Sequence, residues 1–245
     1  MTDGNVRAIL LDIEGTTTPV AFVYEVLFPY ARVHLEEFLG QLEPTDLQSG
    51  VVRELEKEHH DDVARGQAPP DWRSDSADSL LESAARYLFW LMDHDRKSTA
   101  LKSLQGKIWE TGYLSGRLRG EVYPDVAPAF ARWTMQQKRV YIYSSGSVLA
   151  QKLLFAHTTD GDLTGFLSGY FDTTTGPKRE PASYRSISQQ IDVPAAEILF
   201  LSDVTAELEA ARTAGLQTTL CVRPGNAEGA SSWPNSIHNF DAISP

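Results

Sequence analysis

The sequence predicts an α/β fold, a doubly wound and mostly parallel sheet with an inserted helical cap domain. Three observations lead to this prediction. Four short apolar segments have the nearly continuous, β-branched or aromatic character of strands that are buried on both faces of a parallel sheet. Helical patterns lie between the later segments, which implies right-handed crossovers in one sheet. A long helical region separates the first segment from the second. The four predicted strands are residues 6–11, 139–143, 198–201 and 217–222.

Two helices are predicted between the C-terminal strands. Residues 148–155 place apolar side chains along one helical stripe, with Ser147 as the expected N-cap. Residues 205–214 are good helix formers and end at Gly215, where a C-terminal glycine is favoured. Residues 160–180 show no regular pattern, so we predict a loop there.

The region between the first two strands is predicted to fold as a helical unit of its own. It contains a Pro-Pro break at residues 69–70 and lacks any convincing strand pattern. We therefore expect a core domain of residues 1–19 and 121–245, and a cap domain of residues 20–120. The predicted helices of the cap are residues 23–39, 46–60, 75–95 and 97–115.

Two groups of side chains in this insert allow simple structural interpretations. The acids at 54–58 and 61–62 are expected to form a solvated helix face. Four aromatic residues of the insert are expected to pack in the core of the cap, although they could instead contact an apolar group of the substrate. These aromatic residues are Phe22, Tyr24, Trp90 and Trp109.

Composition excludes several functional classes. The 245 residues include 22 Lys+Arg and 33 Asp+Glu, a formal net charge of −11, which disfavours binding to nucleic acid or to an anionic membrane. No apolar stretch approaches the ~20 residues of a membrane span, and the N-terminal residues lack the pattern of a signal peptide. The one cysteine, Cys221, cannot form an internal disulfide. We expect a cytoplasmic protein that acts as a monomer on a small molecule.

Acidic side chains follow two of the predicted strands. Asp12 ends the first strand, with Glu14 two residues later, and Asp203 ends the third. Ligands bind beyond the carboxyl ends of the strands in open α/β sheets, so these carboxylates are expected to converge there. Converging carboxylates repel one another unless a cation neutralises them, and an all-oxygen ligand set suits Mg²⁺.

Hydroxyl groups and a lysine complete the candidate site. Ser144 and Ser145 stand between a strand and a helix, where backbone N–H groups and hydroxyls can hold a phosphate. Lys178 follows in the predicted loop and offers a flexible positive charge. Together these residue types predict a site that can hold a metal ion and a phosphate group.

The motifs resemble the haloacid-dehalogenase superfamily, and more closely its enolase-phosphatases of the methionine salvage pathway. The resemblance covers essentially the whole chain and is carried by residues 12–19 (DIEGTTTP), 95–105 (DRKSTALKSLQ), 141–147 (YIYSSGS), 199–205 (LFLSDVT) and 222–226 (VRPGN). Glu14 stands where most phosphatases of the superfamily have a second Asp. The resemblance implies enolisation of 2,3-diketo-5-methylthiopentyl-1-phosphate, removal of its phosphate to yield the acireductone, and one Mg²⁺ per chain.

The resemblance also implies a role for each residue of the candidate site. Asp12 is the expected nucleophile, and the main-chain carbonyl of Glu14 is expected to contact the metal. The Glu14 side chain is expected either to exchange protons with the leaving group and water or to serve the enolisation step instead. Gly15 is expected to allow a tight turn and Thr16 to steady the loop. The expected catalytic residues are Asp12, Glu14 and Lys178; the substrate-binding residues are Ser144, Ser145 and Lys178; the metal ligands are Asp12, Glu14 and Asp203.

Three other functions share part of this pattern. A phosphatase of the same superfamily for another small phosphate ester would carry the same core motifs. A phospho-accepting signalling module also uses an Asp, a hydroxyl, a Lys and Mg²⁺, but such modules are shorter and lack a helical insert of this size. A dehalogenase would use the same Asp without Mg²⁺, and the carboxylate of Asp203 argues against that activity.

Overall fold

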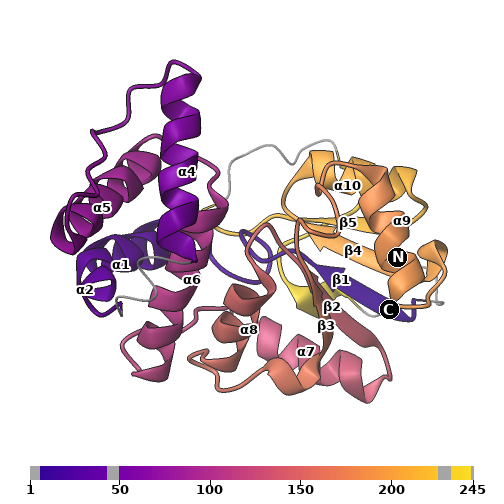
Figure 1. The fold of residues 1–245 in the computed structure, drawn as a ribbon. Helices are drawn as coiled ribbons and strands as arrows, with labels where there is room; N and C mark the ends of the chain where they lie inside the picture. Colours follow the sequence, from indigo (N-terminus) through magenta and orange to yellow (C-terminus); the bar gives the residue numbers. More distant parts are fainter. Residues whose placement is uncertain (1–5, 43–49, 226–232, 244–245) are drawn as a thin grey trace. The chain divides into compact units, whose positions relative to one another are not determined.

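The computed structural model describes residues 6–42, 50–225 and 233–243 (Figure 1). The chain forms two compact units. The first consists of Met1–Glu25 with Ser115–Pro245, and the second is Val26–Leu114. The second unit falls within the insert that was expected at residues 20–120, and the domain boundaries at 19/20 and 120/121 stay predictions.

The first unit is built on a six-stranded parallel sheet with strand order β3-β2-β1-β4-β5-β6. All four strands predicted from the sequence are confirmed, within two residues at each end. The strands are β1 (Ala8–Leu11), β2 (Arg139–Tyr143), β3 (Leu167–Phe171), β4 (Ile198–Ser202), β5 (Gln217–Cys221) and β6 (Ser236–Ile237).

The loop prediction for residues 160–180 is wrong at residues 164–171, which form a short 3₁₀ helix and β3, and is confirmed at residues 172–180. β3 is one of the two edge strands of the described sheet; it pairs with β2 and is mostly half-buried. Its sequence LSGYF therefore lacks the continuous apolar character of the central strands. Gly169 pairs with Tyr141, whose ring would lie 3.1 Å from an added Cβ atom, so the small residue makes room for a neighbouring side chain.

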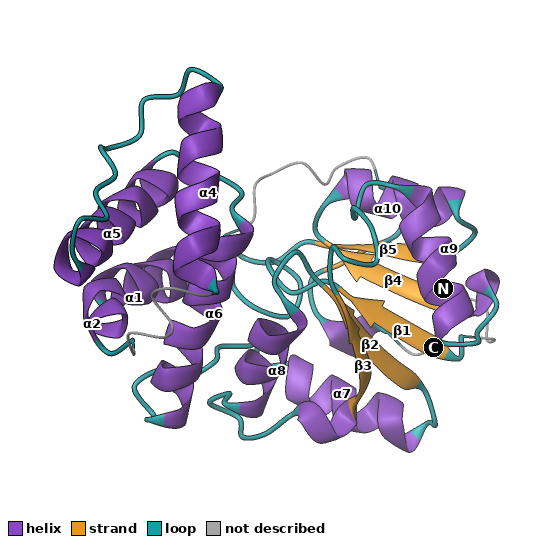
Figure 2. Ribbon diagram, in the orientation of Figure 1, coloured by secondary structure: helices purple, strands orange, loops and turns teal. Residues whose placement is uncertain are grey.

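Helices cover both faces of the sheet, as expected for a doubly wound fold (Figure 2). On one face, α9 (Pro181–Gln190) and α10 (Thr205–Thr213) pack on alternate strand residues such as Leu10 and Phe200. On the other, α7 (Val126–Met135) and α8 (Val148–Ala156) contribute Phe130 and Phe155, whose ring centroids are 6.0 Å apart. Because both faces of the sheet are covered by helices, side chains on both faces of a central strand are apolar, and the strand sequences are nearly continuously hydrophobic.

The predicted helix ends are confirmed in the core. Ser147 is the N-cap of α8, and its hydroxyl accepts a hydrogen bond from Ala150 N at 3.3 Å. Gly215 follows α10 with a φ of 95°, a conformation that L-residues with a side chain rarely adopt.

The second unit is helical, and one apolar cluster is formed by residues from five of its helices, α1, α2, α4, α5 and α6. The predicted helices are confirmed where the structure describes them; residues 46–49 of the second lie outside the described ranges. The first predicted helix is divided into three segments. The helices are η1 (Phe22–Leu27, a π-helix that begins in the first unit), α1 (Phe28–Val33), α2 (Leu35–Gly40), α4 (Val51–Ala64), α5 (Ala77–Asp93) and α6 (Thr99–Leu114). None of the described helices is long and apolar enough to cross a membrane.

The prediction that the acidic residues of α4 form a solvated face is wrong for Asp62. This residue is fully buried and accepts hydrogen bonds from Tyr87 Oη at 2.8 Å and Arg96 Nη2 at 2.6 Å. The two partners supply the compensation that a buried carboxylate requires. The tryptophans of the insert also take structural positions: Trp90 stacks on Tyr87 with ring centroids 5.8 Å apart, and Trp109 Nε1 donates to Leu27 O at 2.9 Å.

Candidate active site

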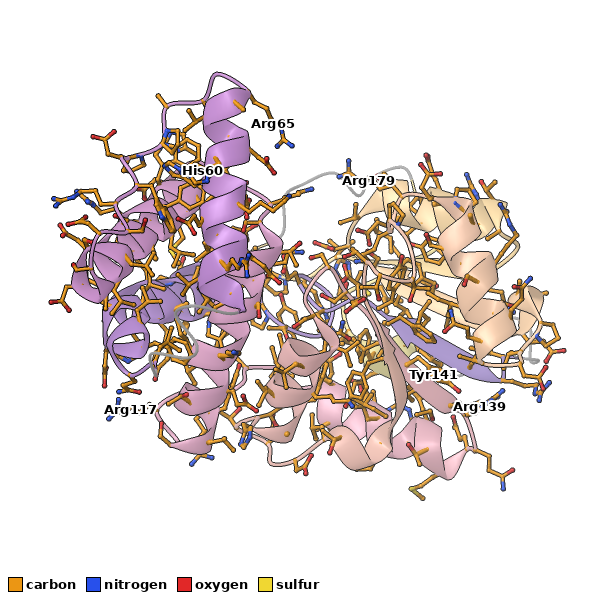
Figure 3. All side chains as sticks on the ribbon, viewed as in Figure 1. His60, Arg65, Arg117, Arg139, Tyr141 and Arg179 are labelled. Atoms are coloured by element: carbon orange, nitrogen blue, oxygen red, sulfur yellow. The ribbon has the colours of Figure 1, made fainter. Side chains whose placement is uncertain are left out.

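The predicted site residues meet at the carboxyl edge of the sheet because β1 lies between β2 and β4. Leu11 pairs with Ile142 on one side and with Leu201 on the other. The next residue, Asp12, donates its backbone N–H to Leu201 O at 3.0 Å. Figure 3 labels Arg139 and Tyr141 on β2; Arg139 begins that strand, so it marks the opposite edge of the sheet.

A buried lysine bridges two carboxylates at this edge. Lys178 Nζ lies 2.6 Å from Asp12 Oδ1 and 2.7 Å from Glu207 Oε2. Burial by itself lowers the pKa of Lys178, but the charges of Asp12 and Glu207 outweigh it and raise the pKa to about 12. Lys178 therefore stays positively charged near neutral pH and holds one oxygen of Asp12.

Glu207 is a member of the site that the sequence analysis missed. It stands in the first turn of α10, and Ser202 Oγ donates to its Oε2 at 3.1 Å and to Asp12 Oδ2 at 3.3 Å. Burial, followed by the charge of Asp12, raises its pKa to about 7. The sequence feature that could have identified Glu207 is its position four residues after Asp203. An acid in the first turn of a helix that directly follows a strand lies at the carboxyl edge of the sheet.

The other two predicted acids share this crowded environment. Burial is the largest cause of the raised pKa of Glu14, and the charge of Asp12 adds to it. The same two causes raise the pKa of Asp203 to about 7. Both shifts come first from burial and then from the charge of Asp12, and a bound cation would stabilise the ionised forms of these carboxylates.

The donor set fits Mg²⁺ better than a metal that needs several protein ligands. No cluster of three or more His, Cys, Asp or Glu side chains with metal-site geometry occurs among the described residues. Mg²⁺ is commonly bound by one or two carboxylates, with water and substrate phosphate oxygens completing its shell. Asp12 and Asp203 supply carboxylates of the kind that such a site uses.

These pKa values predict how stability depends on pH in the absence of divalent metal. Asp203 titrates near 3.8 without its folded environment and near 7 within it. Between these values the folded protein keeps a proton that the unfolded chain has released. Asp203 therefore lowers the free energy of unfolding as the pH rises from about 4 to about 7. Urea denaturation across this window should show a shallower fall for Asp203→Asn than for the wild type. Identical pH dependences would contradict the assignment.

The loop that carries Asp12 is tightly closed on itself. Gly15 has a φ of 68°, and this confirms the expected turn. The amides of Thr16, Thr17 and Thr18 all donate to Ile13 O, at 3.2, 3.0 and 2.9 Å. The hydroxyl that steadies the loop belongs to Thr17, which donates to Asp12 O at 3.2 Å. Thr16 contributes to the turn through its backbone, since its N–H donates to Ile13 O and its carbonyl accepts from Arg223 Nε at 3.0 Å; its hydroxyl has no hydrogen-bond partner among the described residues.

Aromatic and serine hydroxyls hold the loop that carries Lys178. Tyr143 Oη donates to Gly176 O at 2.8 Å, and Tyr184 Oη donates to Lys178 O at 2.6 Å. Between them, Ser183 Oγ donates to Pro177 O at 2.8 Å. Three successive carbonyl groups are therefore fixed by buried side chains, so the lysine enters the site from a rigid segment.

Gly176→Ala should disturb this segment. Gly176 has a φ of 145°, and an added Cβ would clash with the hydroxyl of Ser183. We expect the free energy of unfolding to fall by about 1–3 kcal/mol, with a matching loss of activity as Lys178 shifts. Urea denaturation and a phosphate-release assay measure both effects. Gly165→Ala is the control, because nothing lies within 4 Å of its Cβ position and its φ is not positive. Equal stability of the two variants would contradict this prediction.

The two predicted phosphate-binding serines differ in exposure. Ser144 is buried after β2, and its Oγ accepts from Gly146 N at 3.2 Å, whereas Ser145 is exposed. Gln151 supports their loop from α8, since its Nε2 donates to Gly146 O at 2.8 Å and to Phe171 O at 2.9 Å. The serines thus lie one strand from Asp12, at the same edge of the sheet.

Comparison with known proteins places the whole chain among close relatives. The family model of haloacid dehalogenase-like hydrolases matches residues 6–215. The chain is 50% identical to the enolase-phosphatase E1 of Synechococcus elongatus over 98% of both sequences. It is 48% identical to that of Cronobacter sakazakii, over 98% of this chain and 97% of the relative. Among solved structures, the UTR4 protein of Saccharomyces cerevisiae is 36% identical, with a TM-score of 0.77 over 98% of this chain and 100% of the other.

Proposed function

Because this chain belongs to the enolase-phosphatase E1 family of haloacid dehalogenase-like hydrolases, we propose that it converts 2,3-diketo-5-methylthiopentyl-1-phosphate to the acireductone and phosphate. The substrate is first enolised and then loses its phosphate, a step of methionine salvage. The observation that carries the phosphatase half is the buried carboxylate of Asp12, held by Lys178 at 2.6 Å. Lys178 and Ser202 fix this carboxylate at the edge of the sheet where a phosphate ester would bind.

Asp12 acts in this proposal as the nucleophile. One carboxylate oxygen attacks phosphorus, the bond to the substrate oxygen breaks, and an aspartyl-phosphate forms. Lys178 keeps the carboxylate in place and stabilises negative charge on the transferring group. This electrostatic stabilisation is stronger because Lys178 is buried. Glu207 positions the ammonium group of Lys178 from the other side, at 2.7 Å.

Glu14 is the proposed proton carrier. Burial raises the pKa of Glu14, which favours the protonated form that can donate to the leaving oxygen of the substrate. The resulting carboxylate can then take a proton from the water that hydrolyses the aspartyl-phosphate. Well-placed acid–base groups of this kind contribute typically ~10²–10⁴-fold to rate.

One Mg²⁺ per chain is proposed, held by the carboxylates of Asp12 and Asp203 and the main-chain carbonyl of Glu14. When bound, it would offset the repulsion between the site's carboxylates and an anionic phosphate. Ser144 and Ser145 are proposed to bind the phosphate or neighbouring substrate oxygens. Their loop precedes α8, whose N-terminus favours anions.

The substrate choice is tested by comparing products. Purified enzyme with Mg²⁺ should release phosphate from the diketo phosphate and yield the acireductone, and should act poorly on a panel of sugar phosphates. The alternative, a phosphatase for another small ester, predicts faster phosphate release from a member of the panel and no acireductone. A stable phosphorylated Asp12 that does not turn over would instead support the signalling-module alternative.

We also propose that the enzyme works as a monomer in the cytoplasm. A reduced compartment suits its buried thiol, Cys221, which is the one cysteine of the sequence. Size-exclusion chromatography with light scattering would give a mass near 27.2 kDa for a monomer and about twice that for a dimer.

A further inference from the structure

Arg223 is a buried arginine that contacts the loop carrying Asp12. It stands two residues after β5, and its side chain is only 2% exposed. Its Nε atom donates to Thr16 O at 3.0 Å. Thr16 belongs to the tight turn that follows Asp12, so the guanidinium group is hydrogen-bonded to the backbone of this turn.

The guanidinium group is itself fixed by its surroundings. Its Nη1 atom donates to Asp125 Oδ1 at 2.8 Å and to His238 O at 3.1 Å. Its central carbon lies 4.4 Å from the ring centroid of Tyr123 and 4.5 Å from that of Phe240. Asp125 is held in turn, because its Oδ2 accepts from Phe240 N at 2.6 Å. An arginine with this many constraints has little freedom to move.

Tyr123, whose ring packs on Arg223, makes a second contact with the turn, at Thr17. Tyr123 N donates to Thr17 O at 2.9 Å, while the Thr17 hydroxyl donates to Asp12 O at 3.2 Å. The carbonyls of Thr16 and Thr17 are thus both held by residues outside the turn, and Thr17 passes that constraint to Asp12.

We propose that Arg223 is a positioning residue for phosphoryl transfer, which keeps the turn after Asp12 in the geometry that the nucleophile needs. This inference rests on the proposed function. It predicts a loss in kcat rather than in substrate binding, since a misplacement of about 1 Å in a reacting group can cost ~10²-fold in rate.

The chain offers a matched control for a purely structural role. Arg132 Nη2 donates to Phe240 O at 2.7 Å, and its guanidinium carbon lies 6.0 Å from the Trp133 ring centroid. It therefore supports the same C-terminal segment as Arg223. Among the described residues, its hydrogen bonds and ion pair are made with Phe240, Ile243 and Asp241, outside the turn after Asp12.

The experiment compares Arg223→Gln, Arg223→Lys and Arg132→Gln with the wild type. Steady-state kinetics on the diketo phosphate are measured below the unfolding transition of every variant, together with amide hydrogen exchange at Thr16–Thr18. Arg223→Gln should lower kcat by roughly 10²-fold with little change in KM. It should also speed exchange of these three amides. Arg223→Lys, which keeps a donor, should recover part of kcat, and Arg132→Gln should match the wild type in both readouts.

Two results would overturn the proposal: a kcat of Arg223→Gln close to that of the wild type, or equal losses in Arg223→Gln and Arg132→Gln. Should Arg223→Gln fail to fold, Arg223→Lys and Asp125→Asn carry the same comparison, and wild-type kcat with wild-type exchange in both would count against it. A wild-type enzyme that makes no acireductone would refute the proposed function alone. Hydrogen exchange would then still show whether Arg223 holds the turn.

Discussion

Replacing Asp12 with asparagine should lower phosphate release by roughly four orders of magnitude or more, the size of effect seen when a catalytic nucleophile is removed. The amide is a poor nucleophile, although it nearly matches the carboxylate in shape. The fold should persist, since Lys178 keeps Glu207 as an ionic partner at 2.7 Å. Colorimetric phosphate detection measures the loss, and circular dichroism monitors the fold.

Asp172→Asn is the matched control for this variant. Asp172 also follows a strand of the sheet, but its carboxylate accepts from backbone amides: Oδ2 from Val148 N, in the first turn of α8, at 3.2 Å and Oδ1 from Thr174 N at 2.9 Å. An asparagine retains one acceptor oxygen there, so near-normal activity is expected. If Asp12→Asn behaved like this control, Asp12 would not be the nucleophile.

The second large effect is expected for Lys178→Met. Methionine retains much of the length of lysine but leaves the carboxylates of Asp12 and Glu207 facing each other without a cation. Loss of a group that stabilises transition-state charge costs ~10²–10³-fold in kcat, and we expect at least that loss here. Breaking a buried ion pair by removing one partner costs about 3–5 kcal/mol, an upper limit here because Glu207 can take up a proton.

Lys152→Met separates this effect from the general loss of a lysine. Lys152 lies on α8, is exposed, and its Nζ stands 5.7 Å from the Tyr170 ring centroid. Its substitution should leave phosphate release and urea stability nearly unchanged. Comparable kcat values for the two methionine variants would show that Lys178 has no part in the transfer.

The central strands could be predicted because both faces of each are apolar. Leu10 packs toward α9 and α10, and neighbouring residues pack on the opposite face, so burial leaves a continuous sequence signal. The edge strand β3 has one partner and a half-exposed sequence, which removed that signal. The helix α9 has three buried residues and begins with Pro181, and we assigned no helix to it from the sequence.

The acids show why a site is only partly visible in sequence. Asp12 and Asp203 end recognisable strands, so topology alone predicts that they meet. Glu207 lies on a helix that was predicted correctly, but its role depends on which helix face turns to the sheet edge. Asp62 had the sequence surroundings of a solvated acid, and only the partners Tyr87 and Arg96, distant in sequence, explain its burial.

The most direct test of the central claim is a time course that separates the two proposed steps. Ultraviolet absorbance and released phosphate are followed together in samples of the diketo phosphate with Mg²⁺ and either wild-type or Asp12→Asn enzyme. Wild type should form acireductone and phosphate in step. Asp12→Asn should accumulate the enol phosphate while phosphate stays at background, because proton abstraction needs no covalent intermediate on Asp12. Phosphate release by this variant at the wild-type rate would contradict the account.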